Sequence, residues 1–365
     1  MTADDRYRRN MLYALLLVTV ARLWWLASGQ TDLYPDEAQY WLWSLHPAFG
    51  YYSKPPLVAW LIALTTRGFG ESEFAIRLAA PLLHFATAVI VFELGRRLYD
   101  ARVGAWSAIA YGTLPGVSVS AVIMSTDAPL LFCWAVALYA FLRARETGAW
   151  RWWLLAGVAV GFGLLAKYAM VYWLGSALLY LLAFRDERRH LRRFLGTIAL
   201  ALVIYAPNFL WNWRHGFVSY HHTEDNAALA GAGLHPANLL DFLGSQFGVF
   251  GPLFFATLIV LIVLSGRALR ERRAALLAFF ALPTLALMLA ESLLSRAEPN
   301  WAAPAYLSAT VLVVAWLLTC NLRVIIIVSI ALHVAAAAVL LELKPLAAAV
   351  GYDLPGKYDP LHRLR

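Results

Sequence analysis

Charged residues and cysteines are both scarce in this chain. Only 14% of its 365 residues are Asp, Glu, Lys or Arg, whereas soluble domains carry about 25%. The two cysteines, Cys133 and Cys320, both fall in apolar runs, so the sequence offers neither a disulfide framework nor a CxxC metal motif. Hydrophobic residues make up 61% of the chain, more than a water-soluble core of this length could bury. The bilayer is therefore the expected solvent.

The net charge of +8 does not indicate nucleic-acid binding, because the basic residues fall in short clusters between apolar runs. A membrane-spanning helix needs roughly 20 apolar residues. We therefore predict an all-α integral membrane protein whose eleven spans lie at approximately 11–28, 74–94, 103–119, 128–142, 152–166, 169–184, 194–209, 247–265, 274–293, 302–319 and 323–342. The first run could be a signal peptide, but Ala27-Ser28-Gly29-Gln30 is a poor cleavage context, so we expect an uncleaved helix.

Basic clusters and long polar loops alternate between the predicted spans. One face receives Arg6, Arg8, Arg9, Arg96, Arg97, Arg102, Arg143, Arg145, Arg151, Arg185, Arg188, Arg189, Arg192, Arg193, Arg267, Arg270, Arg272, Arg273 and Arg323. The positive-inside rule makes this face, with the N-terminus, cytoplasmic. The opposite face receives the loops 29–73 and 205–246, the turns near 120–127 and 294–301, and the tail from 343. Their Asp, Glu, His, Asn, Trp and Tyr content indicates function, since loops of 40 residues are rarely mere connections.

An acidic pair follows the first span, in the run Tyr34-Pro35-Asp36-Glu37. Proline followed by two acids is typical of a helix start. The aromatic residues Tyr40, Trp41 and Trp43 suit a helix lying in the membrane interface. A carboxylate in that position can act as a general base, but two acids can also do no more than complement the helix dipole.

Lys54 is one of four lysines and lies just before a second predicted helix, in Tyr51-Tyr52-Ser53-Lys54-Pro55-Pro56-Leu57. An ammonium group beside helix N-terminal amides suits an anion, phosphate above all. The alternative is a lysine that extends to the membrane interface or binds a lipid headgroup.

These two runs resemble the first periplasmic loop of bacterial family 39 and 83 glycosyltransferases, which include the lipid A aminoarabinose transferase and are related to protein O-mannosyltransferases. Further matches follow in chain order on the same predicted face: Ser125-Thr126-Asp127-Ala128-Pro129-Leu130, Leu164-Leu165-Ala166-Lys167-Tyr168, Pro207-Asn208-Phe209-Leu210-Trp211-Asn212 and Ala297-Glu298-Pro299-Asn300-Trp301. The resemblance covers essentially the whole chain. It implies a GT-C fold over residues 1–342, with interfacial helices in the first loop. It also places the chain in a bacterial inner membrane. Family members often continue into a soluble domain where the tail 343–365 lies, so the tail is expected to be a short variant or a truncation.

Such enzymes move a sugar, with inversion, from a polyprenyl-monophosphate carrier to an acceptor. By resemblance, Asp36 matches the family's candidate base, Lys54 the lysine that holds the carrier phosphate, and Asp127 a second acid facing the same cavity. Glu37 is expected to support Asp36 or to lie next to a metal. The family's aminoarabinose transferase has a metal-holding glutamate just before the lysine. Here that position is Ser53, which puts such a metal site in doubt.

The other candidates have competing explanations. Asp127 could simply cap the helix that follows it. Lys167, Tyr168 and Arg296 could bind phosphate, yet Lys167 could also extend to the interface and Arg296 could form a surface pair with Glu298. Acceptor or sugar contacts are predicted for Tyr52, Asn208, Arg214, His222, Glu298 and Asn300.

A divalent metal is an open possibility as a cofactor. His221, His222 and Glu224 are metal-ligand types, but adjacent histidines point to different sides, so the pattern is weaker than HExxH. A solvated loop without ligands is the other interpretation.

The sequence thus predicts a glycosyltransferase whose partners are a polyprenyl-phosphate-linked sugar and membrane lipids. Lipid A, another glycan, a lipid or a protein would each fit as the acceptor, and the oligomeric state is open. The rival class is a transporter or lipid flippase. Transporters need ionisable residues near the bilayer midplane, whereas here the span interiors hold few beyond Arg22, His84, Glu93 and His333.

Overall fold

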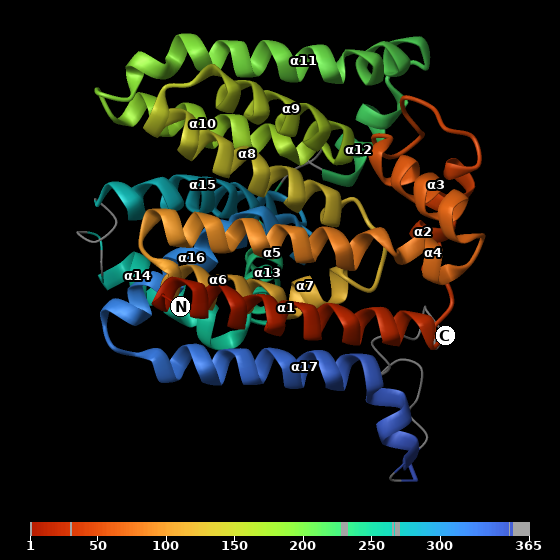
Figure 1. Ribbon diagram of the computed structural model, residues 1–365. Helices are drawn as coiled ribbons and strands as arrows, with labels where there is room; N and C mark the ends of the chain where they lie inside the picture. Colours follow the sequence, from red (N-terminus) through yellow and green to blue (C-terminus); the bar gives the residue numbers. More distant parts are fainter. Residues whose placement is uncertain are drawn as a thin grey trace.

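The computed structural model describes residues 2–29, 31–227, 233–264, 266, 271–349 and 351–352. Within these ranges the chain forms helices and contains no strand (Figure 1). Long helices run side by side as a bundle, and short helices from two loops gather at one end of it. The predicted all-α class is confirmed.

Seven helical segments are long and apolar enough to cross a membrane. They are α1 (Ala3–Ala27), α4 with α5 (Glu73–Arg77 and Ala79–Leu98), α8 (Asp127–Thr147), η2 with α11 (Arg188–His190 and Leu191–Arg214), α15 (Arg272–Leu294), η4 with α16 (Pro299–Ala302 and Ala303–Thr319) and α17 (Arg323–Ala349). The pair α13 (Pro236–Val249) and α14 (Pro252–Leu264), bent by 118°, would make an eighth span. A count of eleven is therefore not confirmed.

The remaining predicted spans are short or broken helices. The helices α9 (Trp150–Ala166) and α10 (Val171–Ala183), the latter preceded by η1 (Tyr168–Met170), are apolar but shorter. The predicted span 103–119 divides into α6 (Ala101–Thr113) and α7 (Pro115–Ser120), because Pro115 forces an extended backbone on Leu114. The predicted span 247–265 was wrong at its start, since Val249 ends α13 and Gly251, at φ +87°, turns the chain into α14.

Close packing between spans depends on small residues. A Cβ on Gly95 of α5 would lie 2.8 Å from the Gly104 Cα of α6, too near for any side chain. Small residues at such crossings let two helix backbones approach each other, as is common in membrane proteins. The backbones of α5 and α6 therefore pack directly against each other at this crossing.

The loops that hold the candidate site residues are themselves helical. The first contributes α2 (Pro35–Ser44) and α3 (Leu57–Phe69), starting at Pro35 and directly after Pro56 as predicted. The second contributes α12 (Val218–Ala227), at the same end of the bundle as α2 to α4 (Figure 1). The second loop starts later than predicted, because residues 205–214 continue α11, and α17 extends through residues 343–349 into the predicted tail. The tail from 353 onward lies outside the described residues.

Candidate active site

A buried ion pair joins the two ends of the first loop. Arg77, at the end of α4, donates from Nε and Nη2 to the two carboxylate oxygens of Glu37 at 2.9 and 2.8 Å. The guanidinium also donates to the Thr31 carbonyl at 3.2 Å and to the Asp32 carbonyl at 2.6 Å. Both partners are almost entirely buried, at 4% and 0% side-chain exposure. Losing one partner of such a pair would leave an uncompensated charge.

Both carboxylate oxygens of Glu37 also accept hydrogen bonds from backbone N–H groups. Its Oε2 also accepts from the backbone N–H of Tyr34 at 2.9 Å, which closes the start of α2. Its Oε1 accepts from the backbone N–H of Met124 at 2.7 Å, which ties α2 to the segment just before α8. With four donors on two oxygens, Glu37 has no lone pair directed at a substrate. These bonds tie Glu37 to the first loop, and its place among the catalytic groups stays a prediction.

Asp127 is held by two side chains from other parts of the chain. Lys167, at the end of α9, donates from Nζ to Oδ1 at 2.7 Å, and Asn300 donates from Nδ2 to Oδ2 at 2.6 Å. The carboxylate is thus not the cap of its own helix, because it caps no backbone amide of α8. Lys167 is likewise not extended into solvent. Asp127, Lys167 and Asn300 come from three of the matched motifs, which thus meet at one point.

Lys54 lies near this pair without joining it. Its ammonium is within electrostatic range of Asp36, Asp127 and Lys167. In the part of the chain that the structure describes, it forms neither an ion pair nor a side-chain hydrogen bond. Burial, together with the positive charge of Lys167, lowers the pKa of Lys54. A partly buried ammonium beside a second cation is poised to gain an anion.

Asp36 lies at the exposed edge of the same cluster, on the first turn of α2. Its carboxylate accepts no hydrogen bond from any described residue, in contrast to its neighbour Glu37. Beneath it, Tyr40 is buried, and burial followed by the charges of Asp36 and Asp127 raises the pKa of the Tyr40 phenol. Both predicted acids are thus within electrostatic range of the same phenol.

The second loop reaches the cluster through His222 on α12. Its ring lies 5.1 Å from the ring of Tyr52 and within electrostatic range of Lys54 and Asp36. Burial and the positive charge of Lys54 lower the pKa of His222 below its ordinary value. The imidazole is consequently neutral at physiological pH, and Tyr52, mostly exposed, lies beside it at the rim.

Hydrogen bonds from buried polar side chains attach the second loop to the first. Asn208 is fully buried and donates to the Phe49 carbonyl at 2.6 Å, and Ser219 donates to the Tyr51 carbonyl at 2.5 Å. Asn212 accepts from the Ser219 amide at 3.3 Å, while its amide and that of Asn208 surround the Tyr168 hydroxyl. These polar groups bond to one another, and the sugar contact of Asn208 and the phosphate contact of Tyr168 stay predictions.

Several candidates stay at the surface. Arg296 and Glu298 face each other at 3.5 Å with side chains 78% and 49% exposed, which is the surface pair considered above. Arg214 is exposed at the end of α11, and no described residue pairs with it.

The residues present do not fit a metal site of the family's design. His221 and Glu224 pair at 3.8 Å, both well exposed. Among the described residues, no three His, Cys, Asp or Glu side chains come together as ligands. Ser53, in the place of the family's glutamate, is buried.

An apolar groove of about 390 Å³ opens next to the charged cluster, between α3, α5, α8 and α9. Leu57 lines it three residues after Lys54, and Pro129 lines it two residues after Asp127. Phe132 and Phe162 line it farther along, and all its described lining side chains are apolar. An anion with a long hydrocarbon tail could place its charge at Lys54 and its tail here.

Arg77 is the functional residue that the sequence analysis missed. The available signal was its position: a lone arginine at the start of an apolar span on the face that the positive-inside rule leaves poor in arginine. A cation there needs a nearby acid, and Glu37 is that acid.

Comparison with known proteins finds similar sequences. Residues 53–211 match the family model for dolichyl-phosphate-mannose-protein mannosyltransferase. The chain is 34% identical to the lipid A galacturonosyltransferase of Rhizobium johnstonii over 311 residues, 85% of this chain and 66% of that relative. It is 27% identical to the undecaprenyl phosphate-alpha-4-amino-4-deoxy-L-arabinose arabinosyl transferase of Pseudomonas paraeruginosa over 214 residues, 54% of this chain and 39% of the relative. The chain thus spans only part of each relative.

Solved structures share the fold. ArnT from Cupriavidus metallidurans superposes with a TM-score of 0.70 at 20% identity, covering 99% of this chain and 68% of that chain. The oligosaccharyltransferase of Archaeoglobus fulgidus superposes with a TM-score of 0.58 at 15% identity, covering 93% and 53%. The sequence motifs, the fold and the matched relatives agree: the chain has the GT-C fold and is similar in sequence to the membrane glycosyltransferases named above.

Proposed function

We propose that this protein transfers a sugar from a polyprenyl-monophosphate carrier to an acceptor at the membrane surface. One observation carries the proposal. An unpaired carboxylate, Asp36, and an unpaired ammonium, Lys54, flank the Asp127–Lys167 ion pair beside an apolar groove in the part of the chain that the structure describes. This arrangement offers a base, a phosphate site and a place for a lipid tail at one location.

The chemistry follows from the positions of these groups. An acceptor hydroxyl or amine attacks the anomeric carbon and forms the new glycosidic bond. The bond from that carbon to the carrier phosphate breaks with inversion, and its electron pair leaves on the phosphate oxygen. Asp36 accepts the proton of the acceptor. Lys54 offsets the charge that develops on the leaving phosphate, which is usually the largest catalytic contribution.

The Asp127–Lys167 pair has a different role. Both oxygens of Asp127 are already occupied, by Lys167 and Asn300. We assign the pair to positioning: it fixes Lys167 as a second positive charge near Lys54. His222 is neutral and can donate one hydrogen bond to phosphate or sugar without adding charge.

The apolar groove is assigned to the isoprenoid tail of the carrier. ArnT from Cupriavidus metallidurans, which shares the fold, has been solved bound to undecaprenyl phosphate. A tail along Leu57, Phe132 and Phe162 would bring the phosphate to the Lys54 end of the groove.

Galacturonic acid is the first candidate sugar, and lipid A the first candidate acceptor. The support is the galacturonosyltransferase relative, which matches 85% of this chain. The second candidate sugar is 4-amino-4-deoxyarabinose, named for relatives that match about half of it. We place the protein in the bacterial inner membrane, with the N-terminus cytoplasmic and the site periplasmic, because the arginine clusters lie at the other end.

Transfer in proteoliposomes tests the proposal. The purified chain, reconstituted with lipid A, is supplied with polyprenyl phosphate carrying radiolabelled galacturonic acid or 4-amino-4-deoxyarabinose. Label should appear in lipid A, and the carrier phosphate should be released in equal amount. Movement of the intact carrier across the bilayer without transfer of label would establish the flippase alternative instead.

A further inference from the structure

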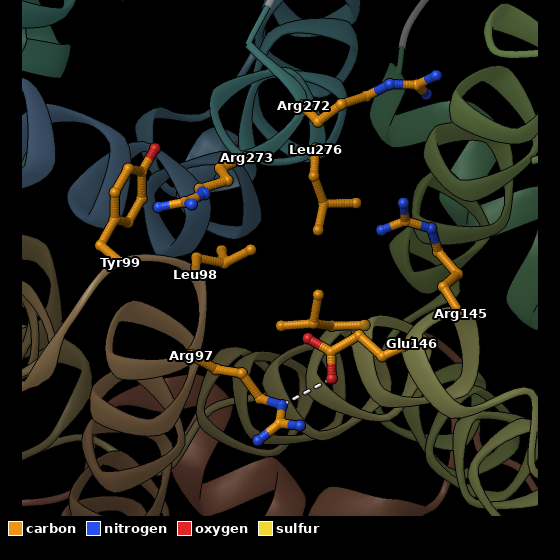
Figure 2. A pocket seen from close by; sticks show the side chains of 9 residues that line it. Arg97, Leu98, Tyr99, Arg145, Glu146, Arg272, Arg273 and Leu276 are labelled. Atoms are coloured by element: carbon orange, nitrogen blue, oxygen red, sulfur yellow. Dashed lines mark hydrogen bonds and ion pairs between the residues drawn. The ribbon is translucent and has the colours of Figure 1, made fainter.

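A second cavity, of about 320 Å³, has the lining shown in Figure 2 and lies at the end of the bundle away from the candidate active site. It is an open pocket lined by the end of α5, the end of α8 and the start of α15. Glu146 at its edge is roughly 28 Å from Asp127 along α8, at a rise of about 1.5 Å per residue. Its lining shares no described residue with the candidate active site.

The lining of this cavity is strongly cationic. It includes four arginines and one acid, namely Arg97, Arg145, Arg272, Arg273 and Glu146. Neighbouring carboxylates neutralise part of this positive charge, because Arg145 pairs with Glu187 and Arg272 pairs with the exposed Asp186.

Two of the arginines keep donors for a ligand. Arg97 donates to Glu146 from Nε alone, at 2.7 Å, and Arg273 approaches Glu271 only at 3.7 Å. Within the described residues, the Nη groups of Arg97 and Arg273 donate no hydrogen bond. Guanidinium groups with free Nη atoms match the oxygens of a phosphate.

Two further groups favour an anion at the same place. The 23-residue helix α15 begins at Arg272, so its first-turn amides and positive dipole end lie at the cavity. Tyr99 lines the cavity beside Arg273, whose guanidinium is 5.9 Å from its ring. Burial, with the charge of Glu271, raises the pKa of Tyr99 to about 12, which keeps its hydroxyl a donor.

The rest of the lining is apolar. Leu98, Leu142 and Leu276 lie among the arginine side chains, as Figure 2 shows for Leu98 and Leu276. A small inorganic anion would leave these leucines unused. An amphiphile with a charged end and a hydrocarbon end would use both halves, and basic pockets between membrane helices suit such lipids.

We propose that this cavity binds the phosphodiester headgroup of an anionic membrane lipid. The phosphate contacts Arg97, Arg273 and the start of α15, and the first carbons of the acyl chains lie against the leucines. The proposal is independent of the transferase activity and concerns the opposite surface of the membrane.

Native mass spectrometry of the full chain tests this site. The protein is titrated with phosphatidylglycerol and with phosphatidylcholine of the same acyl chains, the second being a phosphodiester without net charge. Phosphatidylglycerol should be retained preferentially. Arg273→Gln should weaken its binding by roughly tenfold, the effect of one charge-assisted hydrogen bond, and leave phosphatidylcholine unchanged. Arg192→Gln, an exposed arginine of α11 that does not line the cavity, is the matched control.

Three results would overturn the proposal. Equal retention of the two lipids would mean that the headgroup charge is not recognised. An equal loss in Arg192→Gln would mean that the surface charge acts without a site. Inorganic phosphate that displaces phosphatidylglycerol at equal concentration would identify a site for free phosphate. The melting temperature of Arg273→Gln, expected to match that of the wild type because this side chain is exposed, confirms that folding is intact.

Discussion

At the scale of single residues, Asp36 and Glu37 are adjacent acids with opposite surroundings. Glu37 is fully buried and accepts four hydrogen bonds, whereas Asp36 is exposed and accepts none from the described residues. A saturated carboxylate can hold a loop in place but has no lone pair for a substrate proton. A carboxylate at the rim that accepts no hydrogen bond can take a substrate proton but holds no loop in place. The role we propose in catalysis and the role in holding the loop thus fall to two adjacent residues, Asp36 and Glu37.

Replacing Asp36 with asparagine should reduce transfer by about 10²- to 10⁴-fold, the usual contribution of a general base. The melting temperature should not change, because the side chain makes no described contact. Single-turnover rates with labelled carrier measure the effect. Asp32→Asn, which removes another exposed carboxylate of the same loop, should transfer sugar at the wild-type rate. Near-normal turnover of Asp36→Asn would remove Asp36 from the chemistry.

The Lys54 ammonium should set an alkaline limit on activity. Its pKa is lowered from the ordinary 10.5, and the charged form is the one that binds phosphate. Activity should therefore be present at lower pH and fall as pH rises through this lowered pKa. The variant Lys54→Arg carries a guanidinium that stays charged up to about pH 12, so its alkaline limb should move upward.

The pH dependence of kcat/KM for the carrier is measured for the wild type and for Lys54→Arg. Lys54→Gln should lose activity at every pH, whereas Arg67→Gln, which removes an exposed cation from α3, should retain the wild-type profile. An unchanged alkaline limb in Lys54→Arg would show that another group titrates.

At the scale of helices, the sequence predicted what local chemistry decides. Pro35 and Pro56 predicted the starts of α2 and α3, and both helix starts are confirmed. Pairings between distant segments could not be predicted: Asp127 with Lys167, and Glu37 with Arg77, each join residues 40 apart in the chain. The burial of Asn208 could not be predicted either, because a motif shows residue type but not burial.

The Glu37–Arg77 pair should control the stability of the first loop. Arg77→Gln should destabilise the protein by about 3–5 kcal/mol, because it leaves Glu37 charged and buried. Thermal unfolding of the purified protein in one detergent measures this loss. Arg214→Gln, which removes an exposed arginine without a described partner, should unfold at the wild-type temperature.

A double-mutant cycle separates the pair from its surroundings. Adding Glu37→Gln to Arg77→Gln should cost less than the sum of the single changes, with a coupling of about 0.5–3 kcal/mol. Additive losses would mean that the two residues act independently, in contradiction to their 2.8 Å contact.

At the scale of the whole molecule, the two ends of the bundle carry different chemistry. One end gathers Asp36, Lys54, Asp127 and Lys167 beside an apolar groove, and the other gathers arginines around a second cavity. The long helix α8 connects them, with Asp127 at its start and Glu146 near its end. The orientation of the protein in the membrane therefore decides which of the two sites faces the periplasm and which faces the cytoplasm.

Cysteine labelling in whole cells tests that direction. Cys133 and Cys320 are first replaced by alanine and serine, and single cysteines are then introduced as Glu224→Cys on α12 or Arg192→Cys on α11. Both positions are exposed and lie toward opposite ends of the bundle. A membrane-impermeant maleimide that crosses the outer membrane should label the first in intact cells and the second only after lysis, because the positive-inside rule predicts that the arginine clusters face the cytoplasm. The reverse pattern would place Asp36 and Lys54 in the cytoplasm, and the donor would then have to be used on the inner leaflet.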